Sequence, residues 1–289
     1  MLTSSALLAP HLPTLVEDQH RGHATPMLVA LEALSQRLLA EAPQAVVALS
    51  TRWNAPGPFR VDAGRRHRTL TDYTGMGVVV RYDCNGQPAL ARAIVEAAQR
   101  ANLSAGSATR GVDSGVSVPL HFLVPDRRLP VVPLSLPHRP AAECRQWGAL
   151  LRRVLEAWPE RVLFVVGGVL SYNLHAMNLR RDLPESRTLD ADVLDALTRG
   201  AWSEVGRTRA AALLAQAQPE AALRHLEVLR GFLGADRPGQ VLAYDALPGV
   251  GAALMEFALP ALAPAIAESI AEPDAVPDAA PADHAAGGA

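Results

Sequence analysis

The sequence predicts an α/β protein with three layers, in which a mixed, mostly parallel central sheet carries helices on both faces. Two strand candidates, Ala45–Leu49 (AVVAL) and Arg161–Val166 (RVLFVV), are almost wholly apolar. Such continuous runs are typical of parallel strands that are buried on both faces. They alternate along the chain with amphipathic segments such as Pro88–Ala101 and Ala141–Trp158, which predict helices. This alternation favours a sheet between two helical layers.

The first elements can be placed in order from the N-terminus. Ala6–Ala9 is a short apolar run that stops at Pro10, so we expect a buried strand with His11 at its C-terminal end. Leucines at helical spacing predict a helix over Pro26–Ala42. The Gly-, Pro- and Arg-rich stretch that ends at Thr71 is expected to hold a short hairpin.

The remaining elements follow the same two patterns. Apolar and β-branched runs predict strands over Ala45–Leu49, Val78–Tyr82, Leu129–Leu136, Arg161–Val166, Val241–Tyr244 and Ala252–Phe257. Amphipathic periodicity predicts helices over Pro88–Ala101, Ala141–Trp158, Leu189–Arg199, Ala201–Ala215 and Glu220–Leu233. After a loop at Gly111–Gly115, Val118–Leu123 opens either a helix or a strand.

The domain organisation follows from length and composition. A chain of 289 residues is long enough for one large domain with a well-buried core, and we expect that domain to span residues 1–260. From residue 261 on, Ala, Pro, Asp and Glu dominate with little apolar periodicity. The segment 261–289 is therefore predicted to be a disordered tail.

Composition excludes several classes of function. The formal net charge is −2, so there is no general electrostatic attraction to nucleic acid or to an anionic membrane. The chain contains no lysine, and all 27 of its Lys+Arg residues are arginine, which excludes a P-loop lysine, a Schiff base and a lysine general base. Cys84 and Cys144 lie far apart and outside any CxxC pattern, so free thiols in a reducing compartment are expected.

The sequence also predicts a cytoplasmic protein. No apolar run approaches the roughly 20 residues of a membrane span. The N-terminus lacks a basic region ahead of its apolar stretch, which Pro10 and Pro13 interrupt early, so a signal peptide is not expected.

A candidate pocket is expected where the predicted strands end. In open α/β sheets, ligands bind outside the carboxyl ends of the strands. Here those ends carry His11, Arg52 and the run Ser171–Asn173.

Six short motifs follow one another along the chain, four of them at or near these strand ends. They are Ala9–Pro13 (APHLP), Ser50–Trp53 (STRW), Gly111–Leu120 (GVDSGVSVPL) and Gly167–Asn173 (GGVLSYN), followed by Leu189–Leu194 (LDADVL) and Tyr244–Gly251 (YDALPGVG). In that order they resemble the PHxP, SxHW, xLDHGxxVPL and GSGxLSHN motifs, the late helix and the closing YxxxxGxG strand of the LigB family of class III extradiol dioxygenases and its Memo-like relatives. The resemblance covers about residues 7–257 and implies the three-layer fold of that family.

The resemblance also implies a metal site, from which this chain departs. In the family the first two histidines and a later Glu or other ligand hold Fe(II) or Zn(II), and further histidines act in acid–base chemistry and substrate orientation. By position, His11 stands where the first ligand stands, whereas Arg52 replaces the second. Ser114 and Tyr172 replace the two later histidines. Glu220 is the candidate third ligand, to within one or two residues; the alternative is a glutamate that is favoured only by a helix N-terminus.

Arg52 decides what the resemblance implies for chemistry. A guanidinium is always protonated and has no lone pair to donate, so it cannot ligate a cation and would repel one. We therefore expect a member of this family that has lost its metal and its ring-cleaving activity and needs no cofactor. In its most specific form, the hypothesis has Arg52 occupy the place of the metal and pair with Glu220.

Three roles stay open for such a protein. A pocket holding Arg52, His11 and Tyr172 would suit a small anion or an aromatic acid, because arginine binds carboxylates well. Alternatively, the protein is an active Fe(II)- or Zn(II)-dependent dioxygenase with a rearranged ligand set, or a structural subunit of a homo-oligomer or a complex with a partner subunit. The histidines on which a rearranged set would draw are His121, His138 and His175.

Overall fold

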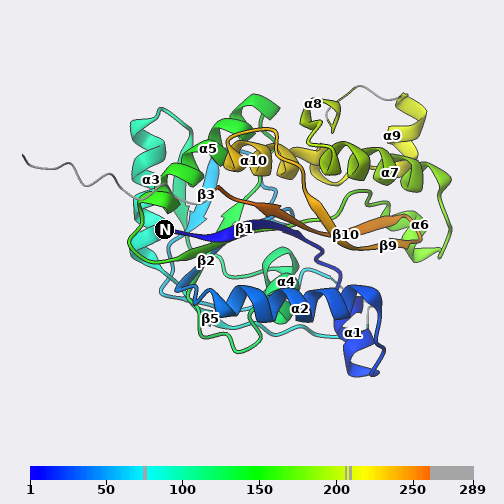
Figure 1. The fold of residues 1–289 in the computed structure, drawn as a ribbon, viewed down its shortest axis with the longest axis horizontal. Helices are drawn as coiled ribbons and strands as arrows, with labels where there is room; N and C mark the ends of the chain where they lie inside the picture. Colours follow the sequence, from blue (N-terminus) through cyan, green and yellow to red (C-terminus); the bar gives the residue numbers. More distant parts are fainter. Residues whose placement is uncertain (74–76, 206, 208–209, 261–289) are drawn as a thin grey trace, which may run out of the picture. The chain divides into compact units, whose positions relative to one another are not determined.

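In a computed structural model of the chain, which describes residues 1–73, 77–205, 207 and 210–260, an eight-stranded sheet lies between two layers of helices (Figure 1). The predicted fold class is confirmed. Residues Met1–Leu259 form one compact unit, and the predicted tail 261–289 lies outside the described residues.

The sheet has the strand order β6-β3-β7-β2-β8-β1-β10-β9. The strands are Leu2–Ala9 (β1), Ala45–Ser50 (β2), Phe59–Asp62 (β3), Ala105–Ala108 (β6), Val131–Ser135 (β7), Val162–Gly167 (β8), Gln240–Leu247 (β9) and Val250–Ala258 (β10). The four central strands β7, β2, β8 and β1 are parallel, whereas β10 pairs antiparallel with both β1 and β9. The carboxyl ends of β1, β2 and β8 therefore meet at one edge of the sheet.

Helices cover both faces of this sheet, as Figure 1 shows. One layer contains α1 (Thr14–His20), α2 (Pro26–Ala40) and α4 (Ser114–Leu123), and the other contains α3 (Pro88–Arg100), α5 (Ala141–Ala157), α7 (Pro184–Thr198) and α10 (Arg224–Leu233). The shorter helices are α6 (Leu174–Asn178), α8 (Trp202–Val205) and α9 (Ala211–Ala217). Because both faces are covered, every residue of β2 and β8 is buried, which explains their continuous apolar sequences.

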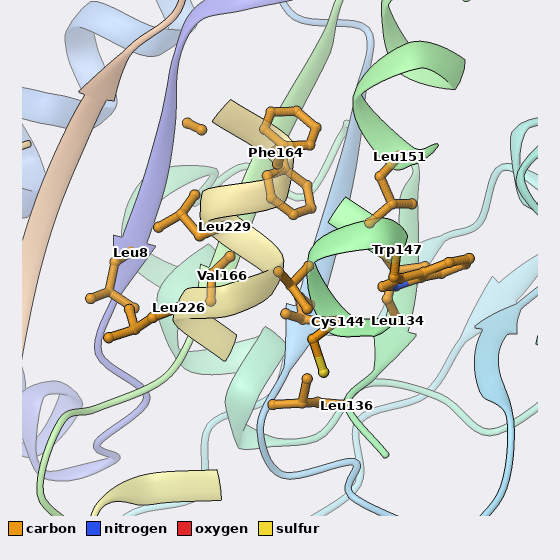
Figure 2. Packing of buried hydrophobic residues seen from close by; sticks show 14 of the residues in the cluster. Leu8, Leu134, Leu136, Cys144, Trp147, Leu151, Phe164, Val166, Leu226 and Leu229 are labelled. Atoms are coloured by element: carbon orange, nitrogen blue, oxygen red, sulfur yellow. The ribbon is translucent and has the colours of Figure 1, made fainter. Parts of the chain in front are cut away.

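The larger core lies between the sheet and the layer that contains α5 and α10 (Figure 2). Phe164 on β8 stacks on Phe232 of α10 with ring centroids 4.0 Å apart, and Phe59 on β3 stacks on Trp147 of α5 at 4.8 Å. Stacked aromatic pairs add to the free energy gained from apolar burial. This packing fixes α10, and with it the segment just before α10, relative to the end of β8.

Outside the candidate site, the structure differs from the sequence predictions at four places. Val78–Tyr82 is not a strand; its backbone donates instead to side-chain hydroxyls, Val80 N to Tyr73 and Tyr82 N to Thr69. The stretch before Thr71 does not fold back on itself as a hairpin, because β3 joins the main sheet and Arg66–His67 (β4) pairs with Cys84–Asn85 (β5).

The other two differences concern helices. No helix was predicted between Pro13 and Pro26, where the structure has α1, and the predicted helix Ala201–Ala215 is divided into α8 and α9. Val118–Leu123, left open between helix and strand, belongs to the helix α4. None of the described helices is long and apolar enough to cross a membrane.

Two glycines allow the start of α4 to approach the ends of β2 and β8. A Cβ atom on Gly115 would lie 2.2 Å from Ser50 Oγ, and one on Gly167 would lie 1.7 Å from the carbonyl oxygen of Gly115. Both are far inside van der Waals contact, and the second contact is with backbone. The glycines of the DSG and GGVLSYN motifs are thus required by close packing at the edge where the site lies.

We predict that Gly167→Ala lowers the free energy of unfolding by about 3 kcal/mol, because the added methyl group cannot be accommodated without a backbone shift. Urea denaturation followed by circular dichroism measures the effect. Gly106→Ala on β6 is the matched control, since its Cβ would meet only the mobile end of Arg60 at 3.1 Å. Equal stability of the Gly167 variant and wild type would show that α4 is not held this closely.

Candidate functional site

The candidate site lies where β1, β2 and β8 end. His11 follows β1, Arg52 follows β2, and Tyr172 lies in the segment that leads from β8 to α6. Glu220 and Ser114 come from elements on opposite faces of the sheet, η1 (the 3-10 turn Glu220–Leu223) and α4. The structure thus brings all five predicted residues to one edge of the sheet, where the rule for open α/β sheets places ligands.

His11 and Glu220 form a buried pair. Nε2 of His11 lies 2.7 Å from Oε1 of Glu220, and the two side chains are 2% and 6% exposed. The other carboxylate oxygen, Oε2, accepts a hydrogen bond from the backbone N–H of Val169 at 2.7 Å. Both oxygens of Glu220 therefore have partners within the protein.

An unusual turn presents Glu220 to His11. Ala221, Ala222 and Leu223 have φ values of 47°, 50° and 59°, in the left-handed region that costs about 1–2 kcal/mol for each residue with a side chain. Helix α10 begins only after this turn, at Arg224. The predicted helix Glu220–Leu233 is therefore confirmed only from Arg224 on. The alternative in which Glu220 serves only a helix N-terminus does not account for its contact with His11.

The two members of this pair stabilise each other's charged forms. Burial by itself lowers the pKa of His11, but the charge and hydrogen bond of Glu220 outweigh it, so the pKa of His11 is raised. Burial by itself raises the pKa of Glu220, and here the interaction with His11 prevails, so its pKa is lowered. The preferred state is imidazolium beside carboxylate.

Arg52 forms a second ion pair, with a residue that the sequence did not indicate. Its Nε donates to Oδ2 of Asp72 at 3.1 Å. Asp72 is held in turn by Ser114, whose backbone N–H and hydroxyl donate to the two carboxylate oxygens, each at 2.9 Å. The predicted pairing of Arg52 with Glu220 is wrong, because Asp72 is closer to Arg52 and Glu220 is bonded to His11.

Tyr172 links the two ion pairs. Its hydroxyl oxygen accepts a hydrogen bond from Nη1 of Arg52 at 3.3 Å, and the guanidinium carbon lies 5.4 Å from the centre of its ring. The same ring meets the His11 imidazole edge-on at 5.7 Å. The resulting chain, Asp72–Arg52–Tyr172–His11–Glu220, contains two acidic and two basic groups and balances its own charge when His11 is protonated.

The buried carboxylate of Asp113 holds the backbone of Arg52 in place through Ser50. Asp113 accepts a hydrogen bond from Ser50 Oγ at 2.6 Å and pairs with Arg110. Ser50 Oγ in turn accepts from the backbone N–H of Arg52 at 3.1 Å. The serine of STRW and the aspartate of VDSG thus fix the backbone at Arg52.

His225 is a buried site residue that the sequence analysis missed. It is 0% exposed, and neither ring nitrogen has a hydrogen-bond partner among the described residues. Burial lowers its pKa to about 4, although the charge of nearby Glu220 acts in the opposite direction. Its imidazole ring lies so close to Gly168 that a Cβ there would be 3.0 Å from Cδ2. A histidine at an apolar position of an amphipathic helix was the only signal for it.

The histidines considered as replacement ligands lie elsewhere. His138 and His175 are exposed, and His121, in the last turn of α4, contacts Gln19 Oε1 at 2.9 Å. Within the described ranges, no group of three or more His, Cys, Asp or Glu side chains is arranged to hold a metal ion. With His11 Nε2 bonded to Glu220 and a guanidinium at position 52, the residues present do not fit the Fe(II) or Zn(II) that the resemblance implies.

Comparison with known proteins places these observations in a family. Residues 5–255 match the family described as the catalytic LigB subunit of aromatic ring-opening dioxygenase. The chain is 26% identical over 202 residues to the dioxygenase tasH of Hapsidospora irregularis, covering 65% of this chain and 59% of that protein. It is 25% identical over 209 residues to the 4,5-DOPA dioxygenase extradiol of Beta vulgaris, covering 64% of this chain and 74% of that protein.

A third relative and a solved structure extend the comparison. The 4,5-DOPA dioxygenase extradiol of Escherichia coli is 28% identical over 171 residues, which cover 56% of this chain and 62% of that enzyme. The chain thus spans about three fifths of two of these three relatives. The crystal structure of an uncharacterized protein from E. coli K12 has the same fold, with a TM-score of 0.66 and 20% identity over 88% of this chain and 99% of that chain.

Proposed function

We propose that this chain, which belongs to the LigB family of aromatic ring-opening dioxygenases, is a member without a catalytic metal. We further propose that it binds a small aromatic or aliphatic carboxylate at the former active site. The proposal rests above all on one observation. Arg52 stands where the resemblance implies a ligand, and its guanidinium is held at the site by Asp72 and Tyr172.

Charge balance supports the absence of a metal. Each of the two ion pairs, His11–Glu220 and Arg52–Asp72, joins one positive and one negative side chain, so the site is neutral without any added ion. A divalent cation at His11 would have to break the 2.7 Å contact with Glu220 and would meet the fixed charge of Arg52. Losing a ligand to a neutral side chain would be less damaging, because water could fill the vacant coordination position.

The geometry of Arg52 supports a carboxylate ligand. Its side chain is 25% exposed, and Nε and Nη1 are used by Asp72 and Tyr172, while no hydrogen bond within the described chain engages Nη2. A ligand carboxylate could therefore accept from the free edge of the guanidinium, with the ring of Tyr172 beside it. Charge-assisted hydrogen bonds of this kind are about twice as strong as neutral ones.

The metal content tests the first half of the proposal. Protein expressed with Fe(II) and Zn(II) supplied should contain only traces of either metal by elemental analysis. Arg52→His, which supplies an imidazole at this position, should bind more Zn(II) than wild type under the same conditions. One Fe or Zn ion per wild-type chain would contradict the proposal and support a dioxygenase with a rearranged ligand set.

Calorimetric titration with benzoate tests the second half. Wild type should bind benzoate saturably, and Arg52→Met should weaken binding by about tenfold or more, since it removes the charged donor. Arg21→Met is the matched control, because Arg21 is 63% exposed and, among the residues that the structure describes, its ion pair is with Glu17 on α1. If wild type shows no saturable binding of aromatic or aliphatic carboxylates, a structural or interaction role replaces ligand binding.

A further inference from the structure

A second candidate binding site lies between α1, α6 and the tip of the β9–β10 hairpin. It is a cavity of ≈310 Å³, which falls in the size range of small-molecule pockets. Its walls are mainly apolar side chains, those of Leu12, Leu15, Met177, Leu247 and Pro248. Thr14, Asp18, Arg180 and Asp245 complete its lining. None of these residues belongs to the Arg52 site.

Two carboxylates give this apolar cavity its chemical character. Burial raises the pKa of Asp245, and the nearby negative charge of Asp18 raises it further. Asp18 accepts a hydrogen bond from Nδ1 of His23 at 3.0 Å, whereas Asp245 has neither an ion pair nor a hydrogen bond from its carboxylate within the described chain. A partly buried carboxylate without a partner is costly, and a cation placed between the two would offset that cost.

Arg180 does not fill this role. It is exposed, and it forms no ion pair with Asp18 or Asp245 in the part of the chain that the structure describes. The cavity therefore has mainly apolar walls, with more negative than positive side chains among its lining residues. Such a combination is complementary to an organic cation and repels an organic anion.

We propose that this cavity binds a small amphipathic amine, with its ammonium group between Asp18 and Asp245 and its apolar or aromatic body against Leu12, Leu15 and Met177. The inference goes beyond the carboxylate site at Arg52 and does not depend on it. Organic amines suit the site better than inorganic cations, because most of the lining would make no favourable contact with a hydrated ion.

Calorimetric titration with benzylamine tests the proposal, with benzyl alcohol as the neutral analogue of the same shape. Wild type should bind benzylamine saturably and benzyl alcohol about tenfold more weakly or worse, because only the amine compensates the carboxylates. Asp245→Asn should weaken benzylamine binding by about tenfold. Asp236→Asn is the control, since Asp236 pairs with Arg230 away from the cavity and should leave binding unchanged.

A second variant removes the cavity rather than the charge. Leu247 is 37% exposed at the end of β9, so Leu247→Trp can fill the cavity without disturbing the core, and it should abolish benzylamine binding while the circular dichroism spectrum stays unchanged. Arg52→Met should leave benzylamine binding intact, which separates this site from the carboxylate site. The proposal is overturned if wild type shows no saturation up to about 10 mM benzylamine, or if both Asp245→Asn and Leu247→Trp bind benzylamine like wild type.

Discussion

Replacement of Glu220 by glutamine should destabilise the protein by about 3 kcal/mol, which is the order of loss found when one partner of a buried ion pair is removed. The carboxylate carries the charge that keeps His11 protonated, and its two oxygens accept from His11 and from the Val169 backbone. A glutamine amide has one oxygen only, so it must turn its NH₂ group toward one of these two donors. Urea denaturation measures the loss.

The pH dependence of this loss identifies its cause. The pKa of His11 is raised in the folded state, so its contribution to stability is complete below its unfolded pKa of about 6.5 and disappears as pH rises through the folded value. Glu220 has a lowered pKa, and its contribution is present above about 4.5 and disappears as pH falls through the folded value. The deficit of Glu220→Gln should therefore be larger at about pH 6 than at about pH 9.

A surface pair provides the control for this experiment. Glu17→Gln removes an ion pair with Arg21 in which the side chains are 29% and 63% exposed, and such pairs contribute about 0.5 kcal/mol or less. If Glu220→Gln were no more destabilising than Glu17→Gln, or if its deficit did not change with pH, the His11–Glu220 pair would not be charged in the folded protein.

The sequence located the central strands well, because burial on both faces leaves a continuous apolar run that needs no tertiary information. It could not locate β3 or β6 in the same way. Ala105–Ala108 (AGSA) has no apolar pattern and becomes a strand only through its parallel pairing with β3. Conversely, Val78–Tyr82 has the composition of a strand, but two of its backbone N–H groups donate to side-chain hydroxyls and not to a neighbouring strand.

For the site, the sequence identified those residues whose position follows from topology. His11 and Arg52 lie two residues after strands and Tyr172 lies in the segment that follows β8, and parallel strands bring their ends together. Asp72 belongs to an irregular segment without periodicity, so nothing in the sequence associates it with Arg52. The left-handed turn after Glu220 was equally hidden, because Ala221 and Ala222 are residues that ordinarily favour a right-handed helix.

His225 should make the protein sensitive to acid, and its replacement by leucine should remove that sensitivity. Burial lowers its pKa from 6.5 to about 4, so between these values the unfolded state binds the proton and the folded state does not. Stability therefore falls as pH falls through this window. The difference of about 2.5 pH units, at about 1.4 kcal/mol for each unit, gives a penalty of about 3 kcal/mol that His225→Leu would eliminate.

The pKa of His11 is shifted in the opposite direction to that of His225, so the two histidines can be separated only by comparing variants. As pH falls, protonation of His11 stabilises the fold and protonation of His225 destabilises it, so the two effects oppose each other in the pH profile of wild type. Subtracting the profile of His225→Leu from that of wild type isolates His225, and His138→Leu, at an exposed position, should leave the profile unchanged. If His225→Leu kept the acid sensitivity of wild type between about pH 6.5 and 4.5, the buried imidazole would have to keep its proton in the folded state. The negative charge of nearby Glu220, which raises the pKa of His225, is the interaction that would favour the protonated form.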